Sequence, residues 1–238
     1  MIKVSITFII KRYDMEKILI CVNSYDGYIS LLNTVWNSVL SLTIPSGYKA
    51  DYIFITEDTE SKCIQYAKVN HITYYTTHTD FTNIEGFKTN INYVYPNYNK
   101  SIRTVWRIIT MRNLSLIKAI EGDYDWLLNI DGDILPSIDG LEKLLSTNAK
   151  CIGARLESKT LPHQFYVTPE NLNNTSEPFR CIIIGNCFTL FHKDTFNIPY
   201  SLRDEDLIGD PIVRCEELRK LGIRLWCHPG IVCEHLDV

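Results

Sequence analysis

The sequence predicts an α/β fold in which a mixed, mostly parallel sheet is flanked by helices. Short apolar segments alternate with segments whose apolar residues recur at helical spacing, which is typical of parallel-sheet proteins. Of the 238 residues, 45% are hydrophobic and 22% are charged, as in an ordinary globular protein. We therefore expect one domain over residues 1–238. Residues 1–14, which precede a second methionine, are either an appendage or an upstream start.

The first half of the chain is expected to supply four strands. Lys17–Val22 is a short apolar run that ends in the turn-rich loop Asn23–Gly27, so it predicts a buried first strand. The other strands expected are 51–56, 72–76 and 125–130, and the helices expected are 29–42, 61–69 and 102–120, with an acidic helix start at 57–60. The Asn- and Tyr-rich residues 78–100 have no period and predict a long loop.

The second half continues the alternation with less regular segments. We expect a helix over 140–146, a strand over 150–155, an irregular stretch over 156–180 and a helix over 211–221 that ends at Gly222. Gly185-Asn186 interrupts an apolar strand over 181–191, and Pro229-Gly230 separates two last short strands, 223–226 and 231–233.

Charge and cysteine content exclude several classes of protein. Lys and Arg total 24 against 28 Asp and Glu, without a basic cluster, so we expect no nucleic-acid partner. No run approaches the roughly 18 apolar residues of a membrane helix, so we expect no membrane span and a cytoplasmic protein. The eight cysteines form no C-x-x-C pair and lie mostly in apolar stretches, which predicts buried free thiols in a reducing compartment. A bridge between Cys227 and Cys233 stays open.

Asp131-Gly132-Asp133 directly follows the apolar run WLLNI. Ligands of open parallel sheets bind beyond the carboxyl ends of the strands, and the glycine permits a turn that brings both carboxylates to one site. Neighbouring carboxylates repel each other unless a cation lies between them, and hard oxygen ligands favour Mg²⁺ or Mn²⁺. Such a cation would stabilise the charge that develops on a nucleoside diphosphate as it leaves an anomeric carbon. Two nearby acids alone are weak evidence, because they are common in solvated turns.

Three blocks of sequence carry a resemblance to a known family. They are MRNLSLIKAIEGDYDWLLNIDGDILP, IIGNCFTLFHKDTF and GDPIVRCEELRKLGIRLWCHPGIVCEHL, and they span roughly the C-terminal 130 residues. Together they resemble the GT-A glycosyltransferases, especially family 2-like enzymes with a D-x-D motif. The resemblance implies a GT-A (nucleotide-diphospho-sugar transferase) fold with a nucleotide-binding half, 17–136, and an acceptor-binding half, 137–238.

The resemblance also implies roles for individual residues. Asp133 would ligate the metal, Asp131 would contact the ribose or sugar and help hold the cation, and His235 would complete the metal shell. Arg112 would approach the diphosphate. The pocket for the base and ribose would be lined by Asn23, Asp26, Glu57 and Asp58.

The base that deprotonates the acceptor is less clearly marked. Asp210 occupies the position of the family's Glu-Asp pair, which reads Gly209-Asp210-Pro211 here. Because of this departure, Glu205 and Asp206 stay open as alternatives for the base. Inversion of the configuration at the anomeric carbon is therefore only preferred over retention.

We therefore expect a metal-dependent glycosyltransferase that uses Mn²⁺ or Mg²⁺ and a nucleotide-sugar donor, with UDP favoured over GDP, and a glycan or other hydroxyl acceptor. Three other functions stay open. One is a non-catalytic module that binds a glycan or a partner on the same fold. A phosphatase fits less well, because its two aspartates normally follow the first strand. A nucleotidyltransferase would carry a Gly-rich, basic loop where this chain has NSYDGYIS.

Overall fold

The computed structural model describes residues 15–57, 61–77, 100–158, 167–169, 177–201 and 210–236, and at 100–106, 156–158, 167–169 and 210 it describes the backbone alone. Within these residues one ten-stranded mixed sheet has the order β3-β2-β1-β4-β9-β6-β10-β8-β7, with β5 paired to β10. The strands are β1 (Glu16–Asn23), β2 (Tyr48–Thr56), β3 (Tyr74–Thr76), β4 (Trp126–Asp131), β5 (Ile134–Leu135), β6 (Cys151–Ser158), β7 (Val167–Pro169), β8 (Phe179–Ile184), β9 (Phe188–His192) and β10 (Leu225–His235).

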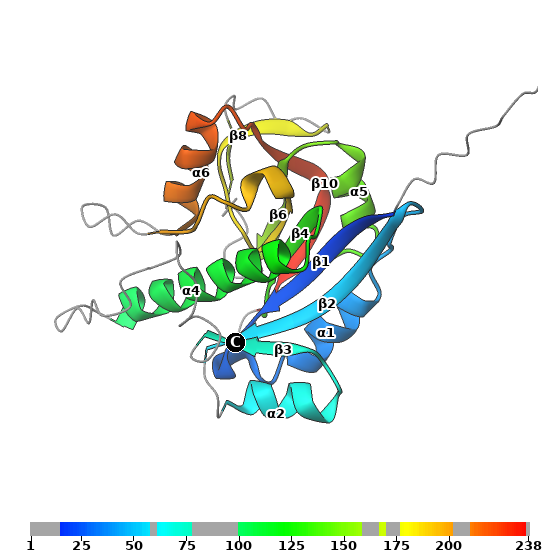
Figure 1. The fold of residues 1–238 in the computed structure, drawn as a ribbon, viewed down its shortest axis with the longest axis vertical. Coiled ribbons are helices and arrows are strands. Elements are labelled where there is room, and N and C mark those ends of the chain that lie inside the picture. The colour runs from blue at the N-terminus through cyan, green and yellow to red at the C-terminus, as the bar shows by residue number, and fades with distance from the viewer. Residues whose placement is uncertain are drawn as a thin grey trace, which may run out of the picture.

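Helices lie on both faces of this sheet (Figure 1). They are α1 (Leu32–Leu40), α2 (Lys62–Val69), α4 (Lys100–Glu121), α5 (Gly140–Ser146) and α6 (Asp210–Lys220), with the short 3₁₀ helices η1 (Asp26–Tyr28) and η2 (Lys193–Thr195). None of these helices has both the length and the apolar composition that crossing a membrane requires.

The strands that position the candidate site are parallel. β3, β2, β1 and β4 all run in one direction, and the β1–β4 register places Asn23 opposite Asp131. Residues 18–23 of β1 are all buried, since both faces of the strand are covered, and this explains the unbroken apolar run in the sequence. β9, β8 and β7 pair with their neighbours in the antiparallel direction, but more residue pairs of the sheet are parallel than antiparallel.

Each face of the sheet has its own hydrophobic core. On one face, α1 buries Leu32, Val35, Trp36 and Val39, which recur at helical spacing and therefore form one apolar stripe, beside residues of α2 and α5. On the other face, α4 crosses β1 and β4, and α6 packs near β8 (Figure 1). Burying one such Leu or Val contributes about 1.5–3 kcal/mol, so Leu32→Ala is expected to cost about 2–5 kcal/mol.

Most expected elements are present, with small shifts at their ends. The helix over 140–146 is confirmed at its bounds. The helix expected at 29–42 covers 32–40 after the 3₁₀ turn η1, and the one expected at 102–120 extends over 100–121. Gly222 has φ +76°, as a left-handed helix cap requires. The expected loop at 78–100 lies outside the described residues except for Lys100, which begins α4.

Four expectations about the segments were wrong. The stretch 156–180 contains the end of β6, β7 and the start of β8. The strand expected over 181–191 is two strands, because β8 pairs with β10 whereas β9 pairs with β4 and β6. Conversely, Pro229-Gly230 does not end a strand: β10 is continuous, and its ladder shifts register between His228 and Val232, as at a β-bulge. Helix α2 begins at Lys62 and not in the acidic segment 57–60, of which only Glu57 is described.

Candidate functional site

The candidate site lies at the edge of the sheet where β1, β2 and β4 end. Backbone hydrogen bonds join the three strand ends: the N–H of Ser24 donates to Ile55 O (3.0 Å), and the N–H of Gly132 donates to Asn23 O (2.8 Å). A Cβ on Gly132 would overlap with Ser24, so the middle residue of Asp131-Gly132-Asp133 must be glycine for the turn to pack this closely on β1.

Asp133 is held in place by the last strand of the chain. β5 pairs with the end of β10, which sets His235 opposite Ile134, and the N–H of Leu236 donates to Asp133 O (2.8 Å). This pairing brings His235 Nε2 to 3.2 Å from Asp133 Oδ2. The two residues are 102 positions apart in sequence, yet the structure places their side chains side by side.

The Asp133 carboxyl is buried, with only 5% of the residue exposed. Burial raises its pKa, and the nearby charge of Asp131 raises it further, while a hydrogen bond from Tyr28 and the imidazole of His235 act in the opposite direction. The hydroxyl of Tyr28 also has a raised pKa, first because of burial and then because of Tyr25 and Asp133. This chemistry suits a divalent cation, because a cation would offset the repulsion between two neighbouring carboxylates.

Asp131 already has a cationic partner within the chain. Nη2 of Arg112, on α4, lies 2.7 Å from Asp131 Oδ2 and 3.0 Å from Oδ1. Arg112 is only 4% exposed, so this ion pair is shielded from solvent. The approach of Arg112 to a diphosphate, which the resemblance implies, stays a prediction. Among the residues the structure describes, no group of three His, Cys, Asp or Glu side chains forms a metal cluster.

The loop after β1 contributes an aromatic layer that the sequence analysis did not single out. The rings of Tyr25 and Tyr28 lie 4.5 Å apart, and the guanidinium of Arg107, on α4, lies 4.7 Å from the Tyr25 ring. Arg107 also forms an ion pair with Glu57 at the end of β2. This ion pair places Glu57 beside the loop that follows β1. No sequence pattern marks Arg107, since only the packing of α4 shows which of its residues reach this edge of the sheet.

Two of the expected pocket residues make structural contacts. Asp26 Oδ1 accepts a hydrogen bond from Cys63 N (3.1 Å) and so caps the start of α2 together with Ser61, whose Oγ accepts from Ile64 N. Asn23 is 3% exposed, and its Nδ2 lies 3.5 Å from Asn129 Oδ1 in a buried polar layer beneath the turn.

The remaining expected residues are not placed by the structure. Asp58, Glu205 and Asp206 lie outside the described residues. Asp210 is the first residue of α6, and only its backbone is described. The eight cysteines are all free, and seven of them are buried, which confirms the reading as apolar core residues and gives no bridge between Cys227 and Cys233.

The arrangement of this sheet is shared with solved glycosyltransferase structures. GalNAc-T7 with UDP, GalNAc and Mn²⁺ matches 95% of the chain at 13% identity with a TM-score of 0.61, and the match covers 45% of that protein. TarS 1–349 of S. aureus in complex with UDP-GlcNAc matches 93% of the chain at 10% identity with a TM-score of 0.55, over 59% of its length. The fold is GT-A.

A third similar structure, A197 from STIV, matches 93% of the chain at 13% identity with a TM-score of 0.50, over 86% of its length. No protein-family model matches the chain, and no curated protein matches it. The likeness therefore rests on the GT-A fold alone, and the chain spans about half of the length of GalNAc-T7 and of TarS 1–349.

Proposed function

We propose that the chain is a metal-dependent glycosyltransferase. It would move a sugar from a nucleotide-diphosphate donor, with UDP-sugars favoured, to the hydroxyl of a glycan or other acceptor, with inversion. One observation carries the proposal: Asp131-Gly132-Asp133 ends a parallel strand at the ligand-binding edge of the sheet, and His235 lies 3.2 Å from Asp133. The solved structures with the same fold that contain UDP or UDP-GlcNAc support this choice of donor.

Asp133 and His235 fit a divalent cation as its protein ligands. Mg²⁺ and Mn²⁺ sites that handle nucleotides often use one or two protein groups and complete their shell with phosphate oxygens and water. The cation, when bound, would supply a Lewis acid at the departing diphosphate. Asp131 would contact the ribose or sugar and help hold the cation, and Arg112 would fix its carboxylate in direction.

The chain would divide into a donor half, 17–136, and an acceptor half, 137–238. In the donor half, Asn23, Asp26, Glu57 and Asp58 would line the base and ribose pocket, together with the aromatic layer of Tyr25 and Tyr28. In the acceptor half, Asp210 would act as the base that accepts the proton of the acceptor hydroxyl, with Asp206 and Glu205 as the alternatives.

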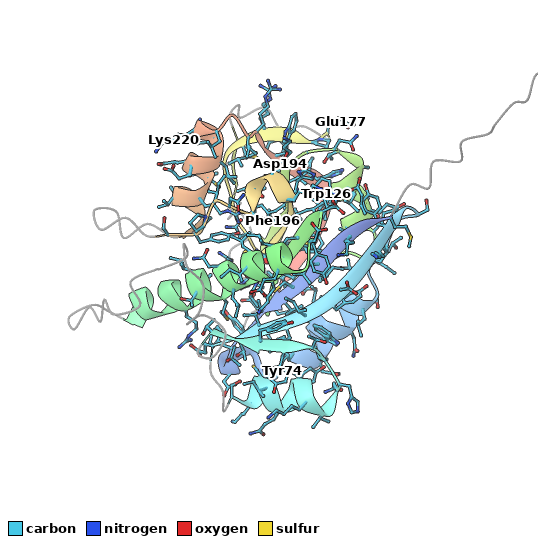
Figure 2. The ribbon with its side chains drawn as sticks, viewed as in Figure 1. Tyr74, Trp126, Glu177, Asp194, Phe196 and Lys220 are labelled. Carbon is cyan, nitrogen blue, oxygen red and sulfur yellow. The ribbon has the colours of Figure 1, made fainter. Side chains whose placement is uncertain are left out.

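Calorimetric titration with UDP and with GDP, each with and without Mn²⁺, tests the proposal. We expect micromolar binding of UDP that depends on Mn²⁺, and loss of that binding in Asp133→Asn. Asp194→Asn is the matched control, because this carboxylate is exposed and pairs with Lys150 away from the site (Figure 2).

Two results would contradict the proposal. If the folded protein binds neither nucleotide in the presence of Mn²⁺, the chain has no donor site. If UDP and Mn²⁺ bind but purified protein releases no UDP from UDP-GlcNAc or UDP-GalNAc with any hydroxyl acceptor, the chain is a binding module on a GT-A fold.

A further inference from the structure

Arg214 carries a charge into the hydrophobic core of one face of the sheet. It lies on α6, one helical turn after Asp210, and is 1% exposed. Its Nη2 donates to Thr195 O (3.0 Å), but Nε and Nη1 are buried without a hydrogen-bond partner, and no ion pair with a described carboxylate is formed. Within the described residues, burying this charge costs stability that an apolar side chain of similar volume would not cost.

The guanidinium of Arg214 contacts two aromatic rings instead. Its Cζ lies 4.3 Å from the ring of Phe191, in β9, and 4.3 Å from the ring of Tyr200. A planar cation can stack on aromatic faces in a fixed orientation, which a flexible ammonium group does less well. The contacts therefore fix the start of α6 relative to β9 and to Tyr200.

Tyr200 is in turn fixed to the helix that carries the ion pair of the candidate site. Asn113 donates from Nδ2 to Tyr200 O (2.9 Å) and accepts at Oδ1 from Tyr200 N (2.8 Å), and both residues are fully buried. The neighbouring residue on α4 is Arg112, whose Cζ lies 5.9 Å from the Tyr200 ring. The ring of Tyr200 thus lies between Arg112, which binds Asp131, and Arg214 of α6.

We propose that Arg214 and Tyr200 are positioning residues that hold the first turn of α6 against the Arg112–Asp131 ion pair. The consequence for catalysis rests on the proposed function: the first turn of α6 begins with Asp210, the candidate base, and Asp131 faces the donor. The contact series from Asp131 through Arg112 and Tyr200 to Arg214 sets the distance between the donor side and the acceptor side of the site.

Hydrogen exchange measured by mass spectrometry tests the positioning without reference to activity. In Arg214→Met and in Tyr200→Leu, exchange over 211–217 should become at least about tenfold faster, while exchange over β1 and β4 stays unchanged. Tyr200→Phe keeps the ring and loses only the hydroxyl, which accepts a hydrogen bond from Asn129 Nδ2 (3.5 Å), so exchange over 211–217 should stay within about twofold of the unmodified protein. Arg219→Met is the matched control, since Arg219 lies on the same helix and is exposed near Lys220, which Figure 2 labels at the end of α6.

Arg214→Lys keeps the charge without the planar group and is a second test if Arg214→Met does not fold. It should show the same local increase in exchange, because a charge alone does not stack on the two rings. An increase no larger than in Arg219→Met overturns the proposal. So does an increase spread evenly over the whole chain, because that pattern indicates only a general loss of stability.

Nucleotide measurements on the same variants test the consequence for catalysis. UDP binding with Mn²⁺ should stay within about twofold, whereas UDP release from UDP-GlcNAc or UDP-GalNAc should slow by at least about tenfold, because a small misplacement of a reacting group has a large effect on rate. Equal loss of binding and rate would show that the two residues do not act through α6. If the unmodified protein does not bind UDP, the proposed function fails, and the exchange result still decides the positioning.

Discussion

Replacing Arg112 with Met, Asp131 with Asn, and both together measures how strongly the ion pair at the base of the site stabilises the fold. The two charges are 2.7 Å apart, and their side chains are 5% and 21% exposed. At an effective dielectric constant of about 20, their attraction amounts to about 6 kcal/mol before the cost of removing both groups from water. Because that cost offsets most of the attraction, we expect a coupling free energy of about 2 kcal/mol.

The assay is urea unfolding of the four proteins with a chelator present, so that no divalent cation compensates for a lost charge. Asp131→Asn removes the ion pair of the buried Arg112, and Arg112→Met removes the ion pair of the half-buried Asp131, so each should lower the free energy of unfolding by about 3 kcal/mol. The double substitution should lower it by about 4 kcal/mol, which is less than the sum of the single effects.

The same set of two single substitutions and one double substitution, made at Lys220 and Glu217, is the control. This pair joins exposed side chains on α6 at 2.7 Å, and its coupling should be below about 0.5 kcal/mol because water screens it. A coupling at Arg112 and Asp131 no larger than in this control would refute the reasoning that burial makes the pair strong.

Three further outcomes follow from single features of the structure. Gly222→Ala places a Cβ at φ +76° and should destabilise the protein by about 1 kcal/mol in urea unfolding, more than Leu221→Ala at the exposed neighbour. Burial, and then the charge of Lys143, lowers the pKa of His228. The unfolded chain therefore binds more protons at this residue than the folded chain does. Unfolding scans should show that the free energy of unfolding decreases as pH falls from about 7.5 to 5, and this decrease should be smaller in His228→Gln. Ellman's reagent should count eight thiols in urea without reductant, and a count of six would reveal a disulfide.

The sequence predicted the parallel part of the fold well because its signals are local. The first strand is apolar throughout, since both faces of β1 are covered, and the run before Asp131 ends where β4 ends. The position of Asp131-Gly132-Asp133 at the ligand edge follows from strand direction alone. β10 was read wrongly because Pro229-Gly230 looks like a break, whereas the chain accommodates it at an irregularity within one strand.

The partners of the site residues could not be predicted from the same signals. Arg112, Arg107 and Arg214 all lie on helices, and helical spacing does not show which strand or loop each side chain meets. The packing of α4 on β4 brings Arg112 to Asp131, a contact that helical spacing alone does not predict. The contact of Arg214 with Tyr200 depends on a segment between β9 and α6 that has no regular pattern in the sequence.

The pairing of β5 with the end of β10 delays completion of the candidate site until long after Asp133 has been synthesised. Asp133 is translated 102 residues before His235 and 103 before Leu236, and both residues contact it in the folded protein. A chain still attached to the ribosome before β10 emerges therefore has the turn but lacks the strand that encloses it. Contacts between residues so far apart in sequence also slow folding. If the candidate site binds Mn²⁺ as proposed, acquisition of that binding would report the moment at which β10 enters the sheet.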